Sequence, residues 1–526
     1  MKQFLKRFFT LQVDLRVHAL GRMTLGAVLL WDWCVRWNIR EMVYFGRGLK
    51  YDDPWYDWRF TALGVTENYT LKTVIFCSFL LPYLGLLLGY RVRLSAALAF
   101  IAFTSLASYN CTLSTAEDSM IQMFLFWTIL IPANPWFTLA SLKPLKWTRS
   151  SRTRVDLAWG WMIPAQLSIM YFGTSASKLA THTWNTGKSI WSFALTPHTG
   201  WWPAVFFLYL GPSLIQFITQ MLPWCQRVMG VLYLIPYKKP RLIAVILSLF
   251  LHLGIQFTLW AGNISIAALI IVAFCLHPDY VDWIIGKFKI HRLMPAKHTS
   301  VPVKPQSKKA FLITVILSSL FVLCQIDDAS DHVPALQFKM PQIFRPPLLY
   351  ELKRSIFRGE HWGMYTSDVY ELLREVYVAE TDEGFFDISW AFEYPWYAPA
   401  HPERPKLEMK YFLGSHAPLL HRQIRQTLYT RIARLGASEY GSFFGFYKKR
   451  FESRFPGLIV KRIHVIFVQK KLPPIGQMKD LNTEDGVSRY RYTTWTAPGF
   501  GQGSAPGESF NNVVELITKN TPKSTM

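Results

Sequence analysis

Long apolar stretches separated by short polar loops fill most of the chain up to residue 326. Nine of them are long enough to cross, or nearly cross, the ~30 Å hydrocarbon core of a bilayer, if short helices tilt or their bounds shift slightly. The pattern predicts a polytopic α-helical membrane bundle of about eight to nine transmembrane helices. The segments are residues 20–35, 72–89, 94–110, 120–132, 157–175, 203–222, 242–260, 264–277 and 310–326.

Basic residues are concentrated in alternate loops between these segments. They lie before the first segment and at residues 91–93, 143–154, 227–241 and 287–309, whereas the other loops are poorer in them or contain balancing acids such as Asp52 and Asp53. Because lysine and arginine favour cytoplasmic loops, the pattern predicts a cytoplasmic amino terminus. It also predicts that Lys178 and the carboxy-terminal region lie outside the cytoplasm.

The chain after residue 326 has a different pattern, which predicts a small extramembrane α+β domain. The segments EVYVAE and FFDISW flank a turn at residues 382–384, as in a β-hairpin, and residues 458–468 alternate like a strand. Apolar residues from Leu420 to Leu435 share one helical face, with Gly436 at the expected C-cap. A Pro-rich loop is expected at residues 394–405 and a flexible tail at residues 497–526.

Composition supports a membrane protein. The chain is 51% hydrophobic and only 17% charged, with a net charge of +23. In a soluble protein that charge would suggest nucleic acid, but here it follows from the cytoplasmic loops, so the expected partner is the lipid bilayer and no nucleic acid. No His, Cys and Asp set has the spacing of metal ligands, so no metal is expected.

Lys178 is the first candidate for chemistry. It follows the segment at residues 157–175 and precedes Trp184, Gly187 and Trp191 in a short polar run. Loss of water at a membrane boundary lowers the pKa of a lysine, and a neutral amine can remove a proton or attack a carbonyl. The alternative is an anchoring lysine whose stem lies along apolar surface while its ammonium reaches water.

His252 is the second candidate, because it lies inside the predicted segment at residues 242–260. A histidine within a membrane helix usually faces the bundle interior, where it transfers protons or forms a helix-packing hydrogen bond. Asp32, Glu117 and Asp118 are expected at the outer level, where each could pair with a basic side chain. For Asp32 we predict a structural ion pair.

Several of these residues occur in motifs that resemble the HTTM domain, the membrane domain shared by vitamin K-dependent γ-carboxylases and many bacterial proteins. Lys178 and Leu179, followed by Trp184 and Gly187, are similar to its "KL, four residues, W, two residues, G" motif. Residues 251–265 around His252 resemble its later histidine motif, and residues 21–32 its opening segment. Asp118, before an apolar run, looks like the bacterial branch, and residues 362–365 (WGMY) resemble the start of the bacterial extramembrane domain.

The resemblance implies an HTTM-like domain at residues 1–290, a basic linker and last helix at 291–326, an extracytoplasmic domain at 327–496, and a bacterial inner-membrane location. It also implies a γ-carboxylase-like enzyme, in which Lys178 is the base for reduced vitamin K or another quinol, and His252 its proton partner. The resulting strong base would abstract a glutamate γ-proton, and carbon dioxide would trap the carbanion. The sequence departs from the carboxylases at Ser177, where they have a second lysine.

Two other functions fit the same features. The first is a non-catalytic maturation factor whose outer domain holds a secreted peptide or protein client. The second is a transporter, which is disfavoured because no inverted repeat or pair of broken helices is evident.

Overall fold

The structure is a computed structural model, and it describes residues 12–38, 40–45, 61–109, 116–130, 154–156, 162–195, 210–258, 264–287, 371–387, 441–471, 475 and 487–496. Up to residue 287 the described chain is almost entirely helical. Its longer helices are α2 (Leu15–Asn38), α3 (Tyr69–Ser78), α4 (Leu80–Leu88), α5 (Val92–Tyr109), α6 (Ala116–Leu130), α7 (Met162–Leu179), α11 (Pro212–Leu234), α12 (Lys238–Thr258), α13 (Ile264–Cys275) and α14 (Pro278–Lys287).

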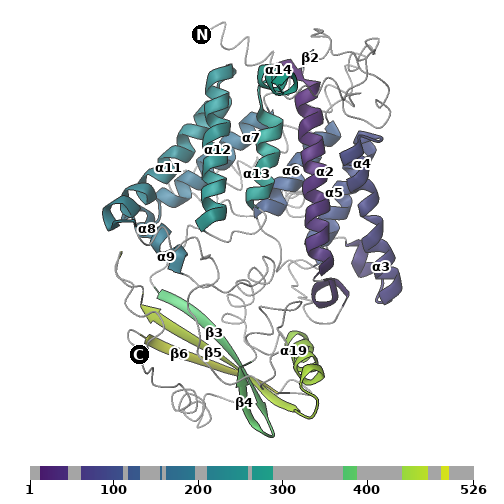
Figure 1. Cartoon of the computed structure of the whole chain (residues 1–526), viewed down its shortest axis with the longest axis vertical. Coiled ribbons are helices and arrows are strands. Elements are labelled where there is room, and N and C mark those ends of the chain that lie inside the picture. Colours follow the sequence, from purple (N-terminus) through teal and green to yellow (C-terminus); the bar gives the residue numbers. More distant parts are fainter. Residues whose placement is uncertain are drawn as a thin grey trace, which may run out of the picture.

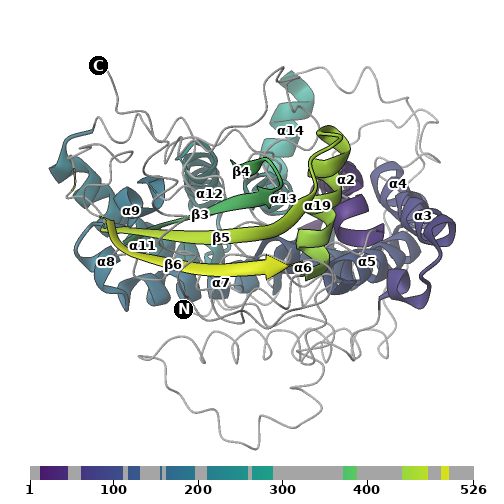
Figure 2. The same cartoon turned by 90° about the horizontal axis from the view of Figure 1, so that it is seen from below.

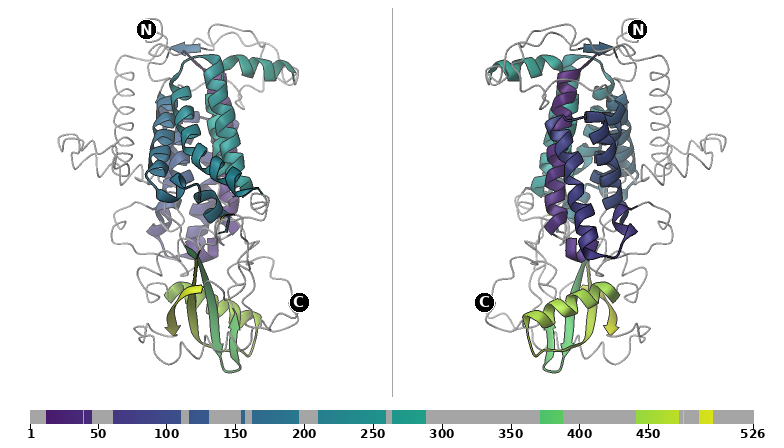
Figure 3. Two further views of the ribbon diagram at one scale, coloured as in Figure 1. Left: turned by 90° about the vertical axis from the view of Figure 1, so that its left-hand side faces the viewer. Right: turned by 90° about the vertical axis from the view of Figure 1, so that its right-hand side faces the viewer.

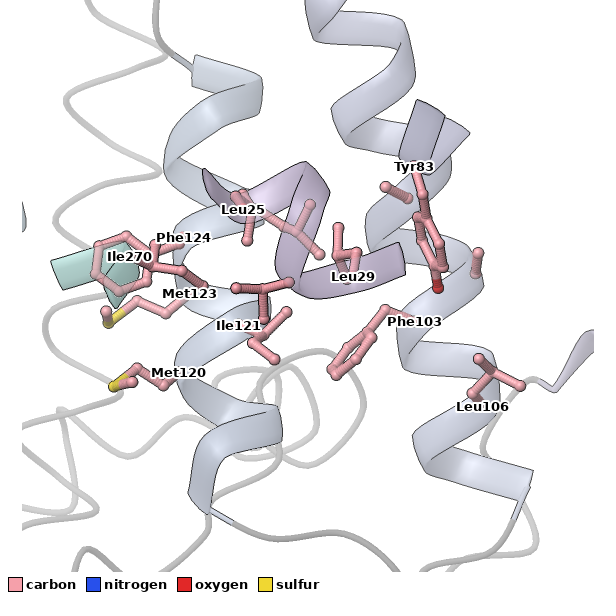
Figure 4. Close-up of a cluster of buried hydrophobic side chains, with 14 of the residues drawn as sticks. Leu25, Leu29, Tyr83, Phe103, Leu106, Met120, Ile121, Met123, Phe124 and Ile270 are labelled. Carbon is pink, nitrogen blue, oxygen red and sulfur yellow. The ribbon is translucent and has the colours of Figure 1, made fainter. Parts of the chain in front are cut away.

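Helix α2 is the central element of the bundle. It packs against α4 on one side and α13 on the other, α5 lies between α4 and α6, and α7, α11, α12 and α13 pack in that order (Figure 1). Figure 4 shows the apolar interior where α2, α5, α6 and α13 meet, with Phe124 beside Ile270 on one side and Phe103 near Leu29 on the other; all four side chains are buried.

Two described helices are long and apolar enough to cross a membrane by length and composition, Tyr69–Leu88 and Val92–Tyr109, and a shorter apolar helix spans Asp118–Leu130. They coincide with predicted segments 72–89, 94–110 and 120–132. The predicted segment 203–222 has the wrong end, because α11 continues through Pro223 to Leu234. The predicted helices at 310–326 and 420–435, the loop at 394–405, the WGMY motif and the tail lie outside the described residues.

The outer surface of the bundle is apolar along several helices. On α11 the exposed large apolar side chains recur every three or four residues, and they are Leu214, Phe217, Met221, Trp224, Val228 and Val231. Helix α12 has the same pattern, with Ile243, Ile246, Phe250 and Leu253. The interior, by contrast, contains Gln122, Gln166, Ser248 and other buried polar groups. A bundle that exposes its apolar faces and buries polar groups suits a lipid surrounding.

Different strands and short helices lie at the two ends of the bundle. Strand β1 (Gln12–Asp14) pairs with β2 (Arg154–Asp156), so the segment before α2 and the loop before α7 lie at the same end. Helix α14 lies across that end (Figures 1 and 3). The short helices α8 (His182–Asn185) and α9 (Ser189–Leu195) are at the opposite end.

A four-stranded antiparallel sheet lies below the end that carries α8 and α9 (Figures 2 and 3). Its order is β4-β3-β5-β6, formed by β3 (Glu371–Thr381), β4 (Gly384–Asp387), β5 (Val460–Lys471) and β6 (Val487–Thr496). Strands β3 and β4 form the predicted hairpin with its turn at residues 382–383. Helix α19 (Gly441–Arg454) packs Phe444 and Phe451 against this sheet. Neither α19 nor β6 was predicted.

Candidate functional site around Lys178 and His252

Lys178 lies in the last turn of α7, where the chain leaves the helix and forms α8 and α9. Its side chain is only 4% exposed, and its ammonium lies 5.4 Å from the centre of the Trp184 ring. Within the described part of the chain, Lys178 has no hydrogen bond or ion pair. It is therefore a buried amine stabilised by an aromatic face rather than by a carboxylate.

The loop after Lys178 is held against α11. Gly187 has a φ of +76°, and a Cβ at this position would lie 2.8 Å from the Cα of Gln216, so the left-handed conformation and the close approach both require glycine. The side chain of Gln220 donates a hydrogen bond to the carbonyl of Asn185 at 2.8 Å. This docking directs Trp184 inward.

Trp184 forms an apolar cluster with Phe193, against which Ile190, Leu222 and Ile255 pack. Ile255 is one turn after His252 on α12, so the aromatic cluster beside Lys178 also borders the helix that carries His252. Leu179, the other residue of the predicted motif, is partly buried at the end of α7.

His252 is buried, and its Nε2 lies 3.2 Å from the hydroxyl of Tyr171 on α7. Lys178 follows Tyr171 by seven residues, or two turns, and so lies on the same face of α7 as the tyrosine that contacts His252. The structure therefore brings the two predicted site residues to the same side of the α7–α11–α12 interface, although no direct hydrogen bond joins them.

Burial has a clear effect on Lys178, which lies beyond the predicted crossing segment at residues 157–175. It lowers the pKa of the amine from its ordinary 10.5 to about 7, because removal from water disfavours the charged form. A substantial fraction of the amine is therefore neutral near neutral pH, as a base or nucleophile requires.

Asp118 does not pair with Lys178. It accepts a hydrogen bond from Arg36 at 2.8 Å, while Asp32 accepts another from Arg36 at 2.6 Å, and all three side chains are buried. The hydroxyl of Tyr44 lies 2.8 Å from the same guanidinium. The predicted ion pair of Asp32 is confirmed, and the family-motif residue Asp118 belongs to that structural network. The side chain of Glu117 lies outside the described residues.

The sequence patterns missed three polar residues of the site: Tyr171, Tyr233 and Ser248. Tyr171 and Tyr233 stack with their ring centres 5.9 Å apart, and both hydroxyls reach Ser248. One signal was available, since Ser248 and His252 are four residues apart and therefore share a face of α12. Their tyrosine partners depend on the register between helices, which the pattern does not reveal.

The described residues include no group of three or more His, Cys, Asp or Glu side chains that could hold a metal ion. No known protein family, curated protein or solved structure matches the chain. The resemblance to the HTTM domain therefore rests on the motifs quoted above and stays a prediction.

Proposed function

We propose that this chain is a polytopic membrane protein of the HTTM type, with about eight to nine crossings in a bacterial inner membrane. Its amino terminus would be cytoplasmic, and its sheet domain extracytoplasmic. The apolar outer faces of α11 and α12, the polar interior and the alternation of basic loops support this proposal.

We further propose that the site around Lys178 carries γ-carboxylase-like base chemistry at the outer membrane face. The observation that supports it most is the juxtaposition of Lys178 and His252, from helices far apart in sequence, around a buried amine that has no carboxylate partner among the described residues. A structural lysine at the same place would be expected to extend its ammonium to water.

The residues around Lys178 suit a quinol such as reduced vitamin K, which is aromatic, apolar and hydroxylated. Trp184 and Phe193 offer aromatic surface, Leu222 and Ile255 offer apolar surface, and Lys178 would accept a proton at Nζ. When bound, such a cofactor would supply the reducing equivalents and the acidic hydroxyl. His252 would hold or move protons beside the amine, and the cluster would exclude bulk water.

The test compares wild type with Lys178→Ala in membranes supplied with reduced vitamin K, bicarbonate and dioxygen, which supplies the epoxide oxygen. Epoxide formation and modified glutamate are followed by mass spectrometry. Lys188→Ala is the matched control, because Lys188 is exposed in the same loop. We expect epoxide from wild type and Lys188→Ala, and loss of it in Lys178→Ala. Epoxide at the wild-type rate from Lys178→Ala would contradict a base role for this lysine.

A second candidate is a non-catalytic maturation factor for a secreted peptide or protein. Placement of the sheet below the end that carries α8 and α9 favours it, because a client held by the sheet would lie near that end (Figure 3). This function predicts no epoxide from any variant, and a client recovered by crosslinking from residues of the sheet.

A further inference from the structure

A set of hydrogen-bonding side chains lies beside His252, between α7, α11 and α12. The hydroxyl of Tyr171 is 3.2 Å from His252 Nε2 and 3.1 Å from Ser248 Oγ. The hydroxyl of Tyr233 is 2.8 Å from Ser248 Oγ, which itself lies 3.5 Å from the sulfur of Met229. All five side chains are buried, so these contacts are shielded from competing water.

The number of protons that each group can donate decides the donor and the acceptor in each hydrogen bond of this network. Ser248 Oγ donates its single proton to the sulfur of Met229, which can only accept, and the hydroxyl of Tyr171 donates to Ser248 Oγ. Both tyrosines must then donate their own protons to Ser248 Oγ. Tyr171 has no second proton to give, so its oxygen can only accept from His252. Nε2 must therefore carry a proton.

We propose that Tyr171 is a positioning residue that, together with Ser248, Tyr233 and Met229, holds the ring of His252 with its proton on Nε2. Nδ1 is then the nitrogen that gains and loses a proton. The nitrogen that is protonated in a histidine is set by the hydrogen bond that the other nitrogen makes. This inference deepens the proposed function, because it names the atom of His252 that would exchange protons beside Lys178.

The experiment measures the protonation of the two ring nitrogens of His252 by ¹⁵N NMR. The full chain is labelled at its histidine rings and reconstituted in lipid nanodiscs. A His252→Gln sample identifies the His252 signals among the 13 histidines. The readout is the tautomer rather than turnover, so its result is independent of whether the protein has carboxylase-like activity.

Wild type should show protonated Nε2 and unprotonated Nδ1. Tyr171→Phe removes the acceptor and should give a mixture of tautomers. Met229→Leu conserves volume but removes the sulfur, so Ser248 can donate to a tyrosine, Tyr171 can donate to His252, and the population with the proton on Nδ1 should rise. Met221→Leu, on the exposed face of the same helix, should leave the wild-type spectrum.

Protonated Nδ1 with unprotonated Nε2 in wild type would overturn the proposal. So would an unchanged His252 tautomer in both Tyr171→Phe and Met229→Leu. Because Met229→Leu is a mild change, its melting temperature should match that of Met221→Leu, and the proposal remains testable even if Tyr171→Phe fails to fold.

Discussion

Lys178 and Arg36 are both buried basic residues, and their surroundings differ. Arg36 is held by two carboxylates, Asp32 and Asp118, so its charge is compensated in place. Lys178 faces the ring of Trp184 and forms no ion pair within the described chain. A buried charge without compensation is costly, so burial lowers the pKa of the Lys178 amine.

The lowered pKa of Lys178 predicts an unusual pH dependence of its reactivity. Below its pKa of about 7 the amine is charged and inert, and above it the neutral form reacts, whereas an ordinary lysine becomes neutral only near 10.5. Acylation of Lys178 by a small membrane-permeant reagent should therefore increase between about pH 6 and about pH 8 and then level off.

Peptide mass spectrometry of membranes that are acylated over a pH series provides the measurement. Lys188 in the same loop serves as the exposed comparison, and Lys178→Arg confirms the assignment of the peptide. A yield at Lys178 that keeps rising up to about pH 10 would show that the amine is hydrated and charged at neutral pH.

At the scale of elements, the register among α7, α11 and α12 creates the site. The hydroxyl of Ser175 donates to the carbonyl of Pro223 at 2.7 Å, and Phe172 packs on Gly230, which keeps α7 antiparallel to α11. Pro223 lies inside α11, where its missing N–H removes the helical bond to the carbonyl of Thr219, and the bond from Ser175 is to the carbonyl of Pro223 itself.

A substitution at Gly187 tests whether the loop after Lys178 depends on its close approach to α11. A side chain there must adopt φ of +76° at a cost of about 1–2 kcal/mol, and its Cβ would press on the backbone of Gln216. Gly187→Ala should therefore detach the loop from α11 and accelerate tryptic cleavage after Lys188, which is already exposed.

The control is Gly254→Ala on α12, where a Cβ meets nothing within 4 Å. It should leave the cleavage rate unchanged. Equal rates in wild type and both variants would show that the loop is not held by Gly187.

Much of this architecture could be predicted from the sequence, because a segment that faces lipid must be apolar and a cytoplasmic loop tends to be basic. The helices near residues 72–89 and 94–110 and the hairpin at residues 371–387 follow from such local patterns. The end of α11 at Leu234 could not be predicted, because a proline such as Pro223 usually stops a helix. The polar neighbours of His252 could not be predicted either, because Tyr171 reaches His252, and Tyr233 reaches Ser248, only through packing between helices.

At the scale of the whole molecule, different elements lie at the two ends of the bundle. The β1–β2 pair and α14 mark one end, while α8, α9, Lys178 and the sheet mark the other (Figure 1). If the first end is cytoplasmic, the site and the sheet face the same outer compartment, as an enzyme or a maturation factor for secreted substrates requires.

The most direct test of this account is the sidedness of single cysteines in intact bacterial cells, on a background in which the six native cysteines are replaced. An impermeant maleimide should label Lys188→Cys and Lys461→Cys from outside, and label Lys239→Cys and Lys287→Cys only after the membrane is permeabilised. Labelling of all four positions without permeabilisation, or labelling of Lys188→Cys from the cytoplasmic side alone, would contradict a site at the outer face of a membrane-spanning bundle.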